Sequence, residues 1–286
     1  MHEHEVVTDA ALVRRLLRAQ FPEWSKLRIE RVASSGTDNA LYRLGADMVV
    51  RLARIGWAVD AIEKERSWLP VLAPHLPVEV PLPLAKGEPG EGFPWPWTVY
   101  TWLEGENPPI GGGSEALAHE LAAFIRALRR IDASSGPQTG RGGPLDAEDP
   151  SVRKALEQLD ADVDIAAATE VWDEALAAPA WDGPPLWLHG DLMASNLLLR
   201  DGRLAAVIDF GTCGVGDPAC DLLPAWNFLP ADARALFRAE LDVDDASWAR
   251  GRGWAVAKAV QAIPYYKETN PPLANNGRQV LRELLA

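Results

Sequence analysis

The chain is poor in cysteine: its 286 residues include only Cys213 and Cys220, too few for a disulfide framework. Their spacing matches no common zinc-binding pattern, so both are expected to be free thiols in a reducing compartment. No run of 18 apolar residues occurs, which argues against a membrane-spanning helix. The N-terminal MHEHEVVTDA has neither the basic region nor the apolar core of a signal peptide. We therefore expect a cytoplasmic protein with no membrane partner.

Positive charge is also scarce. Lys and Arg number 28 against 41 Asp and Glu, so the net charge is −13 at pH 7. Nucleic acid is excluded as the main partner, because its phosphates would be repelled. The balance suits a cationic small substrate, and it equally suits ordinary solubility. With 48% apolar residues the chain is typical of a globular protein of one large domain or two lobes, and a monomer is the default expectation.

The first third of the chain is expected to form a mainly antiparallel sheet with one inserted helix. Apolar residues recur at helical spacing after Asp9, a typical N-cap residue. Prolines in the later strands suit edges and turns. The expected elements are a helix over 9–20, three strands within 27–54, a helix over 57–73, and strands within 77–87 and 93–105.

The remainder is expected to be mainly helical. The turn-rich EGENPPIGGG at 104–113 is the expected linker, which separates an N-terminal lobe (1–103) from a C-terminal lobe (114–286). Ser114 is the expected cap of the next helix, 134–150 an expected surface loop, and 151–178 a further helical stretch. Two short apolar runs around "DGR" predict a small hairpin before the final helices.

Three polar residues on turns beside short strands indicate a site. Asp191 and Asn196 lie in LHGDLMASNLLL, and Asp209 follows the apolar run LAAVI. Loops held by strands fix side chains while leaving them accessible. The oxygens of Asn196 and Asp209 suit Mg²⁺, which brings phosphates with it, and Asp191 is left to accept a hydroxyl proton. The pattern indicates phosphoryl transfer; a set of N-caps and turn aspartates is the alternative.

The motifs carry a family resemblance. HGDLMASN resembles the catalytic loop of protein kinases and, more closely, that of the aminoglycoside phosphotransferase family. IDFG resembles the metal-binding Asp-Phe-Gly, and GDPACDL resembles the motif that follows it in the same family. Three motifs in order are a far stronger signal than any one alone. The resemblance implies an α+β, protein-kinase-like fold with two lobes, over about residues 25–270.

The resemblance also assigns roles to residues. It implies that Asp191 is the catalytic base, Asn196 a metal ligand and Asp209 the principal metal ligand. His189 is expected to support the loop by hydrogen bonding. Asp217 and Asp221 are expected to brace the loop backbone, since an acid that accepts several N–H bonds stays ionised.

The N-terminal lobe lacks a loop with three glycines, yet SSGTDN joins its first two expected strands. This segment resembles the short turn of the antibiotic kinases, which implies that Ser35, Gly36 and Thr37 meet phosphate. Alone it would indicate only a hairpin turn.

Arg51 stands where kinases have the lysine that binds the nucleotide phosphates, and Arg54 is the competing candidate. The helix that follows is expected to supply a glutamate to hold this cation. Glu65 fits better than Glu63, because in the family the acid precedes a run that ends in Leu, here Arg-Ser-Trp-Leu.

TVYTWLEGE resembles the strand that leads into the interlobe hinge. There Tyr100, Trp102 and Leu103 would line the adenine pocket, or the aromatic residues would fill the sheet core.

The resemblance implies ATP, with GTP possible, together with Mg²⁺ and a small-molecule hydroxyl as acceptor. An aminoglycoside-type antibiotic is the expected acceptor, and acids such as Asp160, Asp162, Asp164 and Glu268 could receive its ammonium groups or could be solvated helix charges. Residues 262–276 are the expected substrate wall. The alternatives are a macrolide kinase, a housekeeping kinase for an amino alcohol, homoserine or a sugar, and a non-catalytic nucleotide-binding protein.

Overall fold

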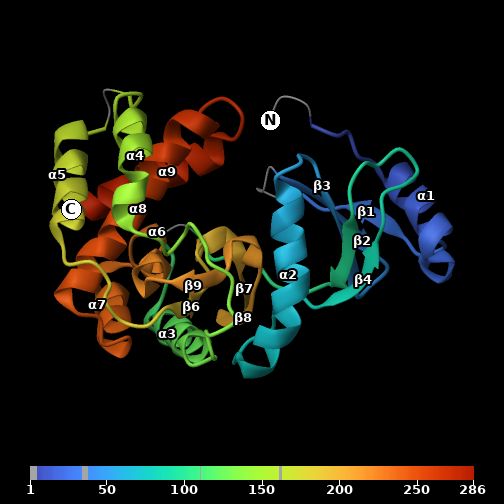
Figure 1. Cartoon of the computed structure of the whole chain (residues 1–286), viewed down its shortest axis with the longest axis horizontal. Helices are drawn as coiled ribbons and strands as arrows, with labels where there is room; N and C mark the ends of the chain where they lie inside the picture. Colours follow the sequence, from blue (N-terminus) through green and yellow to red (C-terminus); the bar gives the residue numbers. More distant parts are fainter. Residues whose placement is uncertain (1–4, 34–37, 110, 161–162) are drawn as a thin grey trace. The chain divides into compact units, whose positions relative to one another are not determined.

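The structure is a computed structural model that describes residues 5–33, 38–109, 111–160 and 163–286 (Figure 1). Its contacts divide the chain into two compact units, which we describe separately. Unit 1 comprises Met1–Pro74, Glu79–Glu104 and Val207–Gly211. Unit 2 comprises His75–Val78, Gly105–Ala206 and Thr212–Ala286.

Unit 1 is built on one antiparallel sheet of five strands in the order β1-β2-β3-β5-β4. The predicted strands are present but shorter than the stretches that contain them, and the residues of 77–82 lie outside the fourth strand. The strands are β1 (Ile29–Arg31), β2 (Asn39–Leu44), β3 (Met48–Ala53), β4 (Pro83–Gly87) and β5 (Trp97–Thr101).

The two faces of this sheet differ in character because side chains alternate along each strand. One face packs into a core with α1 (Ala10–Gln20), to which Tyr42, Val50 and Leu52 contribute fully buried side chains. Helix α1 begins at the predicted cap: Asp9 Oδ1 accepts from Leu12 N at 2.6 Å. Arg51 alternates with Val50 and Leu52, so it belongs to the opposite face of the sheet.

The helix inserted after β3 is α2 (Ala58–Leu72), as predicted. Its Ala58 and Ile62 are buried against Ala53 and Ile55 at the end of β3. The same helix carries Glu65, which is also buried. Packing of α2 beside β3 therefore brings a carboxylate close to the polar face of the sheet.

Unit 2 is mainly helical, with two small two-stranded sheets, β6 with β9 and β7 with β8. The predicted helical stretch 151–178 contains two helices, one that ends at Leu156 and one that begins at Ile165. The helices are α3 (Glu115–Arg129), α4 (Asp149–Leu156), α5 (Ile165–Ala177), α6 (Pro224–Asn227), α7 (Ala231–Glu240), α8 (Asp245–Tyr266) and α9 (Pro271–Leu285). The strands are β6 (Leu186–Leu188), β7 (Leu197–Arg200), β8 (Arg203–Val207) and β9 (Gly214–Gly216).

Short 3₁₀ turns complete the description, and two of them, η4 and η6, border the site. They are η1 (Pro22–Trp24), η2 (Ala73–His75), η3 (Leu145–Glu148), η4 (Ala194–Asn196), η5 (Phe210–Thr212) and η6 (Pro218–Leu222). The predicted loop at 134–150 therefore contains η3 and the start of α4. Ser114 caps α3 as predicted, since its hydroxyl accepts from Leu117 N at 3.2 Å.

Helix α8 runs through the centre of the helical packing in unit 2, against α9, α5, α4 and η6. Two glycines allow its neighbours to approach closely. A Cβ at Gly251 would lie 2.8 Å from Leu222 Cδ1, and one at Gly253 would lie 2.6 Å from Ala175 Cβ. The face of α8 that includes Gly251 is therefore directed at η6, which borders the motif-bearing loop.

No helix in the described parts of the chain has the length and apolar character needed to cross a membrane.

Candidate active site

Residues 189–196, which we call the catalytic loop after the role predicted for Asp191, follow β6 and end in η4, directly before β7. The loop turns sharply at Gly190, whose φ is +81°. A Cβ there would lie 2.9 Å from Arg141 Cβ and 3.0 Å from the carbonyl oxygen of Thr212. Only glycine fits both this conformation and this space. The glycine of the His-Gly-Asp motif therefore sets the position from which Asp191 projects.

The loop backbone is held at several points by buried side chains. Asp221 accepts hydrogen bonds from His189 N and Gly190 N, both at 2.8 Å. Asn227 Oδ1 accepts from Ala194 N at 3.0 Å, and the Nδ1 of His189 accepts from Asp191 N at 3.2 Å. Asp191 thus projects from a backbone with little freedom to move, as a preorganised catalytic group requires. The predicted supporting positions of His189 and Asp221 are confirmed.

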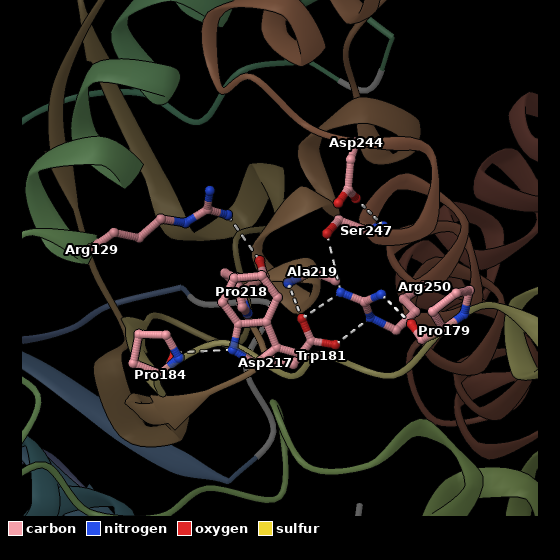
Figure 2. Close-up of polar contacts among 10 residues, drawn as sticks. All are labelled: Arg129, Pro179, Trp181, Pro184, Asp217, Pro218, Ala219, Asp244, Ser247 and Arg250. Carbon is pink, nitrogen blue, oxygen red and sulfur yellow. Dashed lines mark hydrogen bonds and ion pairs between the residues drawn. The ribbon is translucent and has the colours of Figure 1, made fainter.

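Asp217 supports the same region from a second position, shown in Figure 2. Its carboxylate caps η6 by accepting from Ala219 N at 2.9 Å. It also pairs with the buried Arg250 of α8 at 2.7 Å. Burial raises the pKa of Asp221, while His189 and the backbone hydrogen bonds from Gly190 and His189 act in the opposite direction.

Asn196 is bound directly to Asp191. Its Nδ2 donates to the carbonyl oxygen of Asp191 at 2.8 Å and to Asp191 Oδ2 at 3.2 Å. Both hydrogen bonds use the amide nitrogen and not Oδ1, the atom that is predicted to bind metal. The structure therefore brings together two of the three residues that the motifs predicted.

Lys258 of α8 is the residue that the motif analysis missed. Its ammonium forms an ion pair with Asp191 Oδ1, and both side chains are 20% exposed. Burial alone would raise the pKa of Asp191, but the attraction of Lys258 and Arg141 outweighs it and lowers the pKa. The signal in the sequence was a single lysine in the apolar run WAVAKAV, whose other members are all buried.

In unit 1, Arg51 lies between two carboxylates. Its Nη1 donates to Glu65 Oε2 at 2.5 Å, and its Nη2 donates to Asp209 Oδ1 at 3.1 Å. Desolvation would lower the pKa of Arg51, yet the two carboxylates raise it. Glu65 is only 2% exposed whereas Asp209 is 48% exposed, so Asp209 keeps a carboxylate free to meet a ligand.

Asp209 reaches this cluster through an unusual stretch of chain. Residues Val207–Gly211 pack within unit 1, although the segments on either side belong to unit 2. Val207 N donates to the carbonyl oxygen of Glu79 at 3.0 Å. Asp209 itself has φ +65°, a conformation that non-glycine residues seldom adopt outside functional sites and turns.

The alternative candidates in unit 1 are engaged elsewhere. Arg54 pairs with Glu5, and Glu63 pairs with Arg66 and, at 3.7 Å, with Lys86. The predicted pairing of Arg51 with Glu65 is therefore the one that the structure contains.

The expected hinge residues have different surroundings. Tyr100 is buried, and its hydroxyl lies 3.4 Å from the carbonyl oxygen of Ile62, so it fills space between β5 and α2. The guanidinium of Arg43 lies 4.6 Å from the centre of the Trp102 ring. Trp102 and Leu103 are half-buried. That these residues line an adenine pocket stays a prediction.

Two further sets of predictions have mixed outcomes. Ser35, Gly36, Thr37 and Asp162 lie outside the described residues. Asp160 accepts from Lys267 at 2.7 Å and from Arg278 at 3.0 Å, and Asp164 caps α5 by accepting from Ala167 N at 3.0 Å. These two acids therefore have structural partners of their own.

The comparisons with known proteins agree with this geometry. A model of the phosphotransferase enzyme family matches residues 29–257, which is most of the chain. The chain belongs to this family.

Relatives of the phosphotransferase are found in both sequence and structure. It is 25% identical to an aminoglycoside 3′-phosphotransferase of Escherichia coli, over 72% of this chain and 78% of the relative. Its fold is similar to that of wild-type aminoglycoside 2′-phosphotransferase-IIIa in its GDP complex (20% identical, TM-score 0.76, 97% of this chain and 99% of that chain). It is also similar to macrolide 2′-phosphotransferase MphH from Brachybacterium faecium (21% identical, TM-score 0.65, 96% of this chain and 98% of that chain).

The predicted kinase-like α+β fold is thereby confirmed, as is the assignment to the phosphotransferases. Divalent metal is part of the predicted chemistry, and the donor set was tested against it. Among the described residues, no group of three or more His, Cys, Asp or Glu forms a metal cage. The amide oxygen of Asn196 and the exposed carboxylate of Asp209 are hard oxygen donors, and Mg²⁺ commonly takes few protein ligands and completes its shell with phosphate and water. Each of the two donors is of a type that suits Mg²⁺, and that they hold a nucleotide-bound ion stays a prediction.

Proposed function

We propose that this phosphotransferase transfers the terminal phosphoryl group of ATP to a hydroxyl of a small molecule, with Asp191 as the base. The observation that carries the proposal is the Asp191 side chain, 20% exposed, on a loop whose backbone is held by Asp221, Asn227 and His189. Structural acids in turns do not need a backbone fixed in this way. A base that must meet an acceptor oxygen does.

In the proposed step, Asp191 accepts the proton of the acceptor hydroxyl while the oxygen of that hydroxyl bonds to the terminal phosphorus. The bond from that phosphorus to the bridging oxygen breaks, and ADP leaves with the electron pair. Asn196 keeps the carboxylate of Asp191 oriented through its hydrogen bond to Oδ2. Positioning and charge stabilisation supply most of the rate in such transfers, because little covalent chemistry is left to the protein.

Nucleotide binding is proposed for the residues of unit 1. Arg51, held by Glu65, would pair with the phosphates, and the half-buried Trp102 and Leu103 would lie at the base. Asn196 and Asp209 would hold Mg²⁺, which supplies positive charge to the phosphate oxygens. Related structures with GDP, with ADP and with both ATP and streptomycin support a nucleotide donor and leave ATP and GTP to be compared directly.

The relatives suggest which acceptors to test first. Similar structures include kanamycin and gentamicin complexes of aminoglycoside phosphotransferases, together with two macrolide 2′-phosphotransferases. Identity to these structures is 18–21%, so they support the fold and the reaction more than the acceptor. The first panel therefore includes aminoglycosides, macrolides, amino alcohols and sugars.

Asp191→Asn tests the base. We expect turnover in a coupled ADP-release assay to fall by about 10²–10⁴-fold, because a neutral amide cannot accept the proton. Asp232→Asn, an exposed acid in the first turn of α7, is the matched control and should keep wild-type turnover. Circular dichroism and urea unfolding check that both variants are folded.

The proposal is wrong if Asp191→Asn turns over at the wild-type rate. A non-catalytic nucleotide-binding protein would give a different result: Mg-ATP would stabilise the wild type against unfolding, yet no compound of the panel would increase ADP release.

A further inference from the structure

A positively charged side chain lies beside Asp191, although several relatives are named for aminoglycosides, which are themselves positively charged. Both carboxylate oxygens of Asp191 are engaged, Oδ2 by Asn196 and Oδ1 by the ammonium of Lys258. This ion pair is not sealed in the core, because both side chains keep 20% of their surface exposed. An acceptor hydroxyl that approaches Asp191 must therefore arrive beside a lysine ammonium.

A second cation lies close by. Arg141 packs against the catalytic loop: a Cβ added at Gly190 would lie 2.9 Å from the Cβ of Arg141. The positive charge of its guanidinium also lowers the pKa of Asp191. Within the described parts of the chain, the Arg141 guanidinium makes no hydrogen bond or ion pair of its own. Two cations, Lys258 and Arg141, thus act on the carboxylate of Asp191.

Two of the acids that were expected to receive a cationic acceptor already have partners. Asp160 is bound by Lys267 and Arg278. Asp164 caps α5. These residues were expected to bind ammonium groups of the substrate. To do so, the substrate would have to displace the partners that Asp160 and Asp164 already have.

The same face of α8 continues from the ion pair to an aromatic surface. Tyr265 follows Lys258 by seven residues, or nearly two helical turns, and so lies on the same face. Its side chain is 54% exposed and meets Tyr266 edge-on, with ring centres 4.8 Å apart. Exposed aromatic rings of this kind bind the apolar face of a sugar or another ring.

We propose that Lys258 makes this site selective for an acceptor whose reacting hydroxyl has no positive charge beside it. The acceptor is a neutral or anionic ring-bearing alcohol, and polyammonium compounds are poor substrates. The inference rests on the proposed function, because it takes Asp191 as the base. Lys258 acts here as a specificity-determining residue: it repels an ammonium group and leaves an uncharged hydroxyl free to reach Asp191.

Acceptor pairs in which one member carries ammonium groups and the other does not provide the test. Glucosamine is compared with N-acetylglucosamine, 2-aminoethanol with ethylene glycol, and kanamycin with its fully N-acetylated form, each by ADP release with Mg-ATP. We expect the kcat/KM of the wild type to be about tenfold or more higher for the uncharged member of a pair, because the ammonium of Lys258 repels an ammonium group of the acceptor.

Variants of Lys258 then assign the preference. Lys258→Gln should shrink it, mainly by lowering KM for the ammonium-bearing member, while Lys258→Arg should preserve it because the charge remains. Lys154→Gln, an exposed lysine of α4, is the control and should leave the preference unchanged. Circular dichroism establishes that each variant is folded, and the wild-type preference alone decides the case if Lys258→Gln is not.

Three results would overturn the inference: equal or better use of the ammonium-bearing members by the wild type, an unchanged preference in Lys258→Gln, or no turnover of any uncharged or anionic acceptor. Failure of the proposed function looks different. In that case Asp191→Asn would release ADP as fast as the wild type, with water or any other acceptor.

Discussion

At the scale of single residues, the pair formed by Arg51 and Glu65 shows that a buried ion pair matters more for stability than an exposed one. The two groups meet at 2.5 Å with side-chain exposures of 11% and 2%. Burial raises the pKa of Glu65 even though the Arg51 guanidinium lies beside it, which shows that desolvation of this carboxylate is costly. Removal of Glu65 would leave the buried Arg51 with only the more exposed Asp209 as its partner.

Glu65→Ala is therefore expected to lower the free energy of unfolding by about 3–5 kcal/mol, the usual cost of breaking a buried pair. Glu63→Ala removes a more exposed carboxylate from the same helix and should cost about 1 kcal/mol or less. Urea unfolding of both variants measures the difference. Equal losses would mean that the Arg51 pair is worth no more than a surface contact.

The sequence identified most of these residues because motifs fix type and order. Asp191, Asn196, Asp209 and the supporting Asp221 could be found in this way, and their roles toward a ligand stay predictions. Lys258 could not, because it is about 60 residues away from the loop and its contact depends on which face of α8 meets η6. That face is set by close packing at Gly251, a tertiary property with no local signature.

At the scale of elements, α8 is the helix that links scaffold and site, since it carries both Arg250 and Lys258. Its N-terminus is capped by Asp244, whose Oδ1 accepts from Ser247 N at 2.6 Å. Ser247 also accepts from Arg250 at 3.1 Å, so the cap adjoins the Asp217 pair drawn in Figure 2. The start of this helix and the support of the catalytic loop are therefore neighbours.

Asp244→Ala should lower the free energy of unfolding by about 1 kcal/mol, because a backbone donor loses its partner. Asp244→Asn keeps an acceptor and should cost only a few tenths of that amount. The hydrogen bond from Ser247 N lowers the pKa of Asp244. A depressed pKa means that the charge contributes fully above the unfolded value, about 3.9, and that the contribution is lost as the pH falls through the folded pKa.

The difference in stability between wild type and Asp244→Asn should accordingly be constant from pH 8 to pH 5 and shrink below about pH 4. Guanidinium unfolding at a series of pH values gives this curve. A difference that grew toward acid would contradict the assigned cap.

At the scale of the whole molecule, the division into units does not follow the order of the chain. The expected lobes, 1–103 and 114–286, are continuous stretches, whereas unit 1 also takes in Val207–Gly211. Sequence periodicity predicts strands and helices, because it reports which side chains are apolar. It cannot predict that Val207–Gly211, which lie in the sequence between two segments of unit 2, join Glu79 and Arg51 within unit 1, since these contacts are polar and distant in sequence.

Mg-nucleotide should stabilise the molecule through both units. A ligand present at 100 times its Kd adds about 2.7 kcal/mol to the free energy of unfolding. We expect this gain with Mg-ATP, and with Mg-GTP if both nucleotides bind, and a smaller gain when EDTA removes the metal. Asp209→Asn should lose the metal-dependent part, and an unchanged gain in that variant would exclude Asp209 as a ligand. Thermal unfolding with each nucleotide provides the measurement.

Neither Cys213 nor Cys220 forms a disulfide, and both are fully buried in unit 2. Cys220 Sγ lies 3.7 Å from the carbonyl oxygen of Gly190, directly against the catalytic loop, and burial raises the pKa of this thiol. A thiol of this kind is chemically silent while the loop is in place, since reagents attack the exposed thiolate. The rate at which an aromatic disulfide labels Cys220 therefore measures how often the loop that holds Asp191 opens.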